Sequence, residues 1–317
     1  MKNIFIKTVL VAFLLSSTLG TAVARECTTC MKPSAKKTAT QSKAASCKRA
    51  QSTSELNINN VRALINGYGN MWYDGSIARY FIPKDGNSTP LYCAALWIGG
   101  TDVNKQLRLA ALRFGQNGND FWPGPLTVDG TADIIVDVCN EYDKHFKISQ
   151  AEVMAFRQMF DWDTSKTNPQ PPVQNENFSE PDIAQVIRDW PAHGKGNQSF
   201  YLAPFYDANN DGKYDYHDGD YPYYDFENAL CPRTLKANLK PGQPYHPYPT
   251  MEDSLHIVTG GLLSDQVLKG DQTIWWVFND MGNTHTESGG QPIGLEIRAQ
   301  AFAFATNDQI NNMTFYS

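Results

Sequence analysis

The strongest constraint on the fold is a run of alternating residues near the C-terminus. Between residues 293 and 305, every second side chain is aliphatic or alanine, and the positions between them are more polar. This period of two is typical of a β-strand with two different faces. Phe302 and Phe304 make the end of the polar face apolar too, so we expect that end to be buried on both sides. The apolar face consists of Leu295, Ile297, Ala299, Ala301 and Ala303.

Other short apolar runs extend this β-rich pattern. Residues 91–98 and 107–114 flank a Gly-Gly-Thr-Asp-Val-Asn turn, which predicts a hairpin with a loop longer than two residues. Residues 273–278 (TIWWVF) are rich in aromatic and β-branched side chains. We therefore expect a mainly β fold, an antiparallel β-sandwich-like body with two short helices.

Two segments carry helix signals. Ser149 and Glu152 have the spacing of a capping box, and an apolar stripe follows them. The segment 179–182 predicts the start of a second helix, which Pro191 ends. We expect residues 164–177 between them, rich in Pro, Asn and Gln, to be an exposed loop. The apolar side chains are Val153, Phe156 and Phe160 in the first helix, and Ile183, Val186, Ile187 and Trp190 in the second.

The N-terminus has the pattern of a secretory signal peptide. Lys2 and Lys7 precede a short apolar run, and residues 22–24 form an Ala-x-Ala cleavage site, so residues 1–24 are the predicted signal. The alternative is an uncleaved anchor. No later stretch is long and apolar enough to predict a transmembrane span. We expect a protein that is secreted or displayed on the outer cell surface.

Charge is distributed unevenly along the chain. Residues 25–53 carry a net charge of +6 and no aromatic side chain, which predicts a disordered basic tail or linker. Such a tail is either a solvated linker or a contact to an anionic surface such as lipopolysaccharide or phospholipid. The remaining 264 residues, 54–317, form the predicted domain and carry −14, although the whole chain sums to −6. A strongly acidic domain argues against a nucleic-acid partner.

The six cysteines leave the disulfide pairing open. An exported chain permits disulfides, and the three cysteines of the body allow at most one pair among themselves. The Cys27-x-x-Cys30 spacing alone is weak evidence for zinc or redox chemistry, because no second ligand pair accompanies it. The cysteines are Cys27, Cys30 and Cys47 in the tail, and Cys93, Cys139 and Cys231 in the body.

Residues 207–218 have the spacing of a twelve-residue calcium-binding loop. Oxygen-bearing side chains occupy positions 1, 3, 5, 9 and 12, glycine at position 6 permits the sharp turn, and position 7 offers its backbone carbonyl. The alternative is an acidic turn without a metal. The flanking residues do not predict EF-hand helices, so we expect the ion to be structural. The predicted ligands are Asp207, Asn209, Asp211, Lys213, Asp215 and Asp218, with Asp220 as an extra candidate.

A carbohydrate-active protein is the competing hypothesis. Asp120 beside Trp122, and Glu287 or Glu296 near Trp275 and Trp276, would suit the paired carboxylates of a glycosidase. Sugar binding without catalysis would use exposed aromatic side chains. The candidates are Trp72, Tyr73, Trp122 and the tyrosines of 221–224. For all of these aromatics the alternative is core packing.

Several blocks resemble large surface proteins of Bacteroidota that are exported by the type IX secretion route. The resemblance implies a secreted or surface-attached protein of β-rich modules, serving adhesion or gliding, and it brings no catalytic residues. Family members usually end in a C-terminal sorting domain, which is absent here, so we expect either a fragment or a truncated member. The blocks are LNINNVRALINGYGNMWYD (56–74), ALWIGG (95–100), GNDFWPGPL (118–126), YDKHFKIS (142–149), the calcium loop ending in GDYP, and residues 275–308.

The sequence thus favours a non-catalytic, calcium-stabilised extracellular or cell-surface module. Its expected partners are the export machinery and surface glycans or other surface proteins. The alternative is a secreted protein that binds carbohydrate or hydrolyses glycosides.

Overall fold

The computed structural model describes residues 46–115, 117–163, 170–209, 211–224 and 268–317, which fall within one compact unit, Lys43–Ser317. The predicted signal peptide and most of the predicted tail lie outside the described residues. The described part is mainly β, and all of its pairings between named strands are antiparallel, as predicted. In the same part, no helix combines the length and apolar character that crossing a bilayer requires.

A five-stranded sheet, here called the first sheet, comes from the start of the described chain. Its strands follow the order β1-β2-β3-β5, and β4 pairs with β2. Thr53 lies opposite Asn66, and Glu55 opposite Leu64, so these four side chains share one face. The strands are β1 (Thr53–Leu56), β2 (Arg62–Asn66), β3 (Asn70–Met71), β4 (Tyr80–Phe81) and β5 (Ala94–Ala95).

The second sheet contains the long strands that the sequence predicts near the C-terminus. Its order is β16-β15-β14-β8, and β9 also pairs with β14. β14 and β15 pair along their whole length, from Gln272 opposite Ala303 to Asn279 opposite Glu296. The strands are β8 (Trp122–Pro123), β9 (Phe146–Ser149), β14 (Gln272–Asn279), β15 (Glu296–Ala303) and β16 (Phe315–Tyr316).

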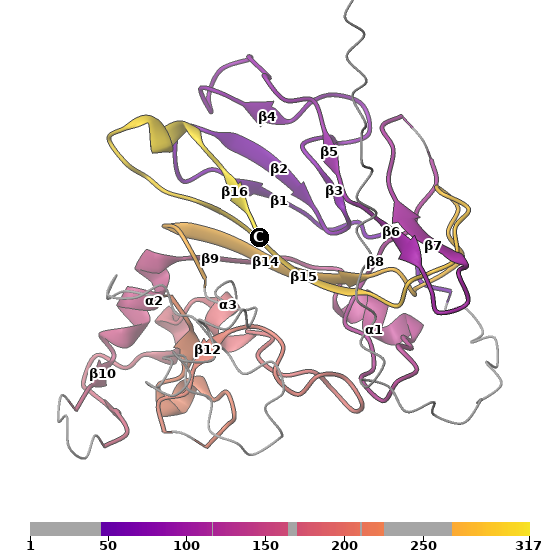
Figure 1. The fold of residues 1–317 in the computed structure, drawn as a ribbon. Coiled ribbons are helices and arrows are strands. Elements are labelled where there is room, and N and C mark those ends of the chain that lie inside the picture. The colour runs from indigo at the N-terminus through magenta and orange to yellow at the C-terminus, as the bar shows by residue number, and fades with distance from the viewer. Residues whose placement is uncertain (1–45, 116, 164–169, 210, 225–267) are drawn as a thin grey trace, which may run out of the picture. The chain divides into compact units, whose positions relative to one another are not determined.

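The two sheets pack face to face, which confirms the predicted sandwich-like body (Figure 1). Leu56 and Ile65 of the first sheet share a buried cluster with Ile274, Trp276 and Phe278 of β14. Ala301 and Ala303 of β15 belong to the same cluster, so the apolar face of the alternating run points inward as predicted. Burial of this interface stabilises the fold by the hydrophobic effect.

A third layer covers the other face of the second sheet. Trp275 and Val277, which alternate with the inward residues of β14, contact a cluster that includes Val153, Ile187 and Phe205. All eight residues of β14 are therefore buried. Two short ladders belong to this part of the chain: β10 (Phe160–Asp161) with β11 (Val173–Gln174), and β12 (Phe205–Tyr206) with β13 (Tyr221–Pro222).

The helices follow the sequence signals only in part. The helix α2 (Gln150–Arg157) has the predicted capping box, with Ser149 and Glu152 each accepting the other's backbone N–H. The predicted second helix is wrong as a continuous element. It consists of a 3-10 turn, η1 (Glu180–Asp182), and a four-residue helix, α3 (Gln185–Arg188). Ile183 between them is extended, with φ −72° and ψ 126°, which interrupts the helical hydrogen bonds.

One helix has no signal in the sequence. α1 (Val136–Glu141) begins after Ile135, whose side chain cannot cap a helix, and it packs on β8. The predicted hairpin forms as β6 (Trp97–Thr101) and β7 (Leu107–Ala111), with Asp102 accepting backbone N–H groups inside its loop. Its first strand differs from the prediction, because Gly99–Thr101 pair within β6 and Ala94–Ala95 pair with β3 instead. Two further 3-10 turns are η2 (Tyr216–Asp218) and η3 (Gln309–Asn312).

The described residues include 46–53, which precede the domain boundary expected at residue 54. A disulfide joins Cys47 to Cys139, and both cysteines are buried. The carboxylate of Asp143 accepts the backbone N–H groups of Gln51 and Ser52. The end of the basic segment is thus fixed to the body by a covalent bond and by charge-assisted hydrogen bonds. Of the other cysteines, Cys93 is a free thiol, and Cys27, Cys30 and Cys231 lie outside the described residues.

Candidate functional site

The predicted calcium loop is closed by a short β-ladder. Phe205 pairs with Pro222, and Tyr206 pairs with Tyr221. Asp207 follows the first strand of this ladder and Asp220 precedes the second, so the two residues mark the beginning and the end of the loop. The flanking elements are strands and turns, which agrees with the expectation that no EF-hand helices surround the loop. Residue 210 is outside the described residues.

The first half of the loop is organised by Asp207. This buried carboxylate accepts the backbone N–H of Asp211 at 3.2 Å and that of Gly212 at 2.8 Å. Gly212 has φ +78°, a conformation that favours glycine, as position 6 of the loop requires. Asn209 also accepts from the Asp211 amide, at 3.1 Å. Positions 1, 3 and 5 of the predicted loop are therefore brought together around one turn.

The second half of the loop is arranged differently. Asn209 donates its side-chain amide to Asp218 at 3.1 Å, which joins positions 3 and 12. Asp215 instead caps η2, where it accepts the backbone N–H of His217 at 2.9 Å. Lys213 is exposed and donates its backbone N–H to Asp211 at 2.8 Å. The structure brings all six predicted residues into one hydrogen-bonded turn system, since the Asp215 carbonyl accepts the Asp218 amide at 3.0 Å. The Asp215 side chain, however, is used to cap η2.

Asp220 is the most deeply buried carboxylate of the loop region. Its two oxygens accept the backbone N–H groups of Ala208 at 2.7 Å and Asp215 at 2.8 Å. Burial, with a smaller contribution from the charges of Asp207 and Asp211, raises the pKa of Asp220 to about 8 against the opposing effect of those two hydrogen bonds. Burial followed by Asp215 and Asp211 also raises the pKa of Asp218. Both pKa shifts are due first to burial of the carboxyl group and then to the negative charges of the neighbouring carboxylates.

The loop is attached to the core of the third layer. The Tyr214 hydroxyl donates to the carbonyl oxygen of Ile187 at 2.6 Å, and the Tyr214 amide donates to Nε2 of His193 at 2.9 Å. That amide fixes Nε2 of His193 as an acceptor. Burial lowers the pKa of His193, which favours the neutral ring that this contact needs. A change in the loop should therefore reach the core through Tyr214.

Calcium at this loop stays a prediction. Across the described ranges, no group of three or more Asp, Glu, His or Cys side chains is arranged so that it could hold a metal ion. The donor chemistry nevertheless fits calcium, which prefers hard oxygen ligands from carboxylates, amides and backbone carbonyls. Asp207, Asp211 and Asp218 would supply carboxylates, Asn209 an amide oxygen and Lys213 a carbonyl.

The acids considered for glycoside hydrolysis have structural contacts. Asp120 is fully buried and accepts the backbone N–H groups of Ala111, Glu287 and Ser288. Glu287 is buried and paired with Arg113 at 2.6 Å, and Glu296 is paired with Arg298 at 2.7 Å. Because these oxygens already hold protein groups, the carboxylates do not form a pair facing a substrate.

Most of the aromatic residues considered for sugar binding lie in the core. Trp122, Trp275 and Trp276 are buried, as are Tyr221, Tyr223 and Tyr224. Trp72 is half-buried and donates its indole N–H to the Tyr316 hydroxyl at 2.6 Å. Tyr73 is the exception among these candidates, since it lines a cavity on the first sheet.

Comparison with known proteins gives no relative for this chain. No protein-family model, no curated protein and no solved structure matches it. The resemblance to exported surface proteins of Bacteroidota therefore stays an expectation from the sequence, and the function is argued from the site alone.

Proposed function

We propose that the protein is a non-catalytic extracellular or cell-surface module whose 207–218 loop binds one structural calcium ion. The observation that carries this proposal is the folded turn around Asp207. The side chains of Asp207 and Asn209 both accept the backbone N–H of Asp211, so positions 1, 3 and 5 of the predicted loop meet in one turn. A bound divalent cation would offset the repulsion among these groups.

The position of the loop favours a structural role for the ion. Tyr214 and the β12–β13 ladder connect the loop to the buried cluster beneath the second sheet. Calcium would therefore stabilise the third layer, including the loop and the residues that pack on it.

Export is part of the proposal and has two supports. The N-terminal 24 residues have the composition of a signal peptide. The Cys47–Cys139 disulfide suits an oxidising compartment, where such bonds persist. Adhesion or gliding, and export by the type IX route, rest on the sequence resemblance.

Thermal unfolding with and without a chelator tests the proposal. The melting temperature of the calcium-loaded protein should fall by several degrees in EDTA and recover when excess calcium is added. Asp211→Ala should melt like the chelated wild type and should not respond to EDTA. An EDTA-insensitive wild type would rule out a structural ion.

A further inference from the structure

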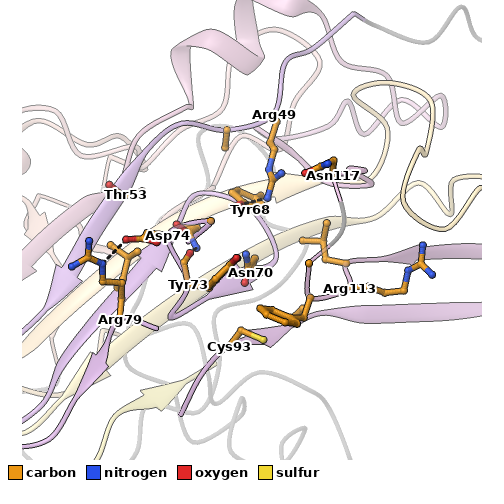
Figure 2. A pocket seen from close by; sticks show the side chains of 18 of the residues that line it. Arg49, Thr53, Tyr68, Asn70, Tyr73, Asp74, Arg79, Cys93, Arg113 and Asn117 are labelled. Atoms are coloured by element: carbon orange, nitrogen blue, oxygen red, sulfur yellow. Dashed lines mark hydrogen bonds and ion pairs between the residues drawn. The ribbon is translucent and has the colours of Figure 1, made fainter. Parts of the chain in front are cut away.

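A cavity of about 640 Å³ lies on the face of the first sheet that points away from the second sheet (Figure 2). Its floor includes Thr53 opposite Asn66, and Asn70 opposite Ala95, on neighbouring strands. This volume falls within the range of about 300–1,000 Å³ that is typical of small-molecule sites. The floor thus offers the hydroxyl of Thr53 and the side-chain amide of Asn70, whereas the buried Asn66 donates its amide to the Tyr73 carbonyl at 3.1 Å.

Aromatic rings form part of the wall. Tyr68 and Tyr73 line the cavity, and Tyr73 contacts Phe114 edge to face with ring centroids 5.2 Å apart. Tyr92 lies 5.1 Å from Phe114, and both of these rings are largely exposed. Exposed aromatic rings beside polar groups are typical of surfaces that hold a ligand with both polar and apolar faces.

The charged groups of the cavity differ in their partners. Arg79 is paired with Asp74 at 2.5 Å, and Arg113 with Glu287 at 2.6 Å. The guanidinium carbon of Arg49 lies 4.2 Å from the centroid of the Tyr68 ring, and Arg49 donates to the hydroxyl of that residue. Within the described part of the chain, no carboxylate is paired with Arg49. The positive charge of Arg49 is therefore available to an anionic ligand.

The chain around Arg49 is held in place on both sides. The Cys47–Cys139 disulfide fixes the residues before it, and Asp143 fixes the backbone of Gln51 and Ser52 after it. Stacking on Tyr68 restricts the side chain itself. A cation held this way loses little conformational freedom when it binds a ligand, which favours affinity.

We propose that this cavity binds an acidic oligosaccharide, with Arg49 contacting a carboxylate of the sugar. Glu55 also lines the cavity and is paired with Arg62 at 3.2 Å. The other charged lining groups are thus paired with opposite charges, and Arg49 is the cation without a carboxylate partner among the described residues. Together with the hydroxyl and amide groups of the floor, this fits a ligand with few charges and many hydroxyls. Aromatic rings pack against the C–H faces of sugar rings. An acidic peptide, by contrast, lacks the many hydroxyl groups that the polar floor would bind. The proposal is independent of the calcium loop, which belongs to the third layer.

Isothermal titration calorimetry on the full chain, kept in calcium, tests the proposal. The probes are trigalacturonic acid and 3′-sialyllactose, their neutral counterparts maltotriose and lactose, and tetraglutamate. We expect at least one acidic sugar to bind more tightly than the neutral ones. Binding of no sugar in the panel, or of tetraglutamate alone, would overturn the proposal.

Two variants locate the site, and one serves as the matched control. Arg49→Gln should weaken binding of the acidic sugar at least tenfold, which corresponds to about 1.4 kcal/mol. Asn70→Ala should weaken binding of the same sugar through the loss of a floor amide. Arg188→Gln removes an arginine from α3 in the third layer and should leave the affinity unchanged. Equal affinities for Arg49→Gln and Arg188→Gln, both with wild-type melting temperatures, would contradict the assignment.

The free thiol of Cys93 gives a second readout at the same place. Cys93 lines the cavity and has intermediate exposure. The acidic sugar should slow alkylation of Cys93 by iodoacetamide, measured by peptide mapping, and Arg49→Gln should remove that protection. An unchanged alkylation rate at saturating sugar would place the ligand elsewhere.

Discussion

Tyr206 and Tyr221 stack on each other where the acidic loop begins and ends, with ring centroids 4.9 Å apart and ring planes 11° apart. Each tyrosine adjoins an acidic residue, Asp207 on one side and Asp220 on the other. The guanidinium carbon of Arg157 lies 5.3 Å from the Tyr221 ring, so α2 contacts the same stack. The stack thus holds together the two ends of the proposed calcium loop.

Removing one ring of this stack should destabilise the folded loop while leaving every predicted calcium ligand unchanged. We expect Tyr221→Ala to lower the melting temperature and to weaken calcium binding about tenfold, because the loop ends are no longer held together. Tyr221→Phe keeps the ring and should retain most of the affinity. Calcium titrations of the two variants make the comparison, and equal affinities would show that the stack has no role in binding.

The two predicted helix caps should behave differently on mutation. Ser149 accepts the Glu152 amide in a complete capping box, whereas Ser179 makes no side-chain capping bond. Ser149→Ala should therefore lower the free energy of unfolding by about 1 kcal/mol. Ser179→Ala is the matched control and should change it by a few tenths at most. Urea unfolding measures both, and equal losses would contradict the difference between the two sites.

The disulfide should contribute strongly to stability, since Cys47 and Cys139 are separated by 92 residues. Closing a loop of that length in the unfolded chain is worth about 4.6 kcal/mol in the chain-entropy account. We expect Cys139→Ala to unfold at clearly lower urea than the wild type. It should also weaken binding of the acidic sugar, because Arg49 loses one of its anchors. Wild-type stability of the variant would mean that the bond does not form.

The contribution of His145 to stability should become unfavourable at mildly acidic pH. Burial lowers the pKa of His145 to about 4, and its ring lies 5.6 Å from that of Trp276. Between about pH 6.5 and 4 the unfolded chain binds the proton and the folded chain does not, so stability is lost as the pH falls. The loss is at most about 3 kcal/mol.

His145→Gln cannot take up that proton and should remove this part of the pH dependence. Urea unfolding at pH 7.5 and pH 5 measures it for the wild type and the variant. An equal loss of stability in the two proteins would assign the acid sensitivity to another group.

Local patterns in the sequence predict the elements that are determined locally. The alternation at 293–305 predicts β15, and the Ser149–Glu152 spacing predicts α2, because period and capping depend on near neighbours. The continuous helix predicted over residues 179–190 is wrong because the spacing of its apolar residues reflects tertiary packing. Ile183, Ile187 and Trp190 are all buried in the core, although the chain between them is not one helix.

Long-range features could not be read from the sequence. The Cys47–Cys139 pair and the contact between Asp143 and residues 51–52 depend on tertiary folding. The cavity on the first sheet likewise combines residues 49–118 from several strands and turns. Of its lining residues, Tyr73 is predicted from the sequence as a candidate for sugar binding. Asp120 and Glu287 show the opposite problem. Their positions near tryptophans in the sequence suggested a catalytic pair, but in the structure both carboxylates bind other groups of the protein.

Direct calcium titration tests the central claim most sharply. We expect isothermal titration calorimetry of the chelator-stripped protein to show one bound calcium ion per chain. The double variant Asp207→Ala, Asp211→Ala should bind none. The matched control Asp85→Ala, Asp182→Ala, which removes the same charge from exposed sites outside the loop, should bind like the wild type. A wild type that gives no binding heat, and no calcium by elemental analysis, would contradict the account.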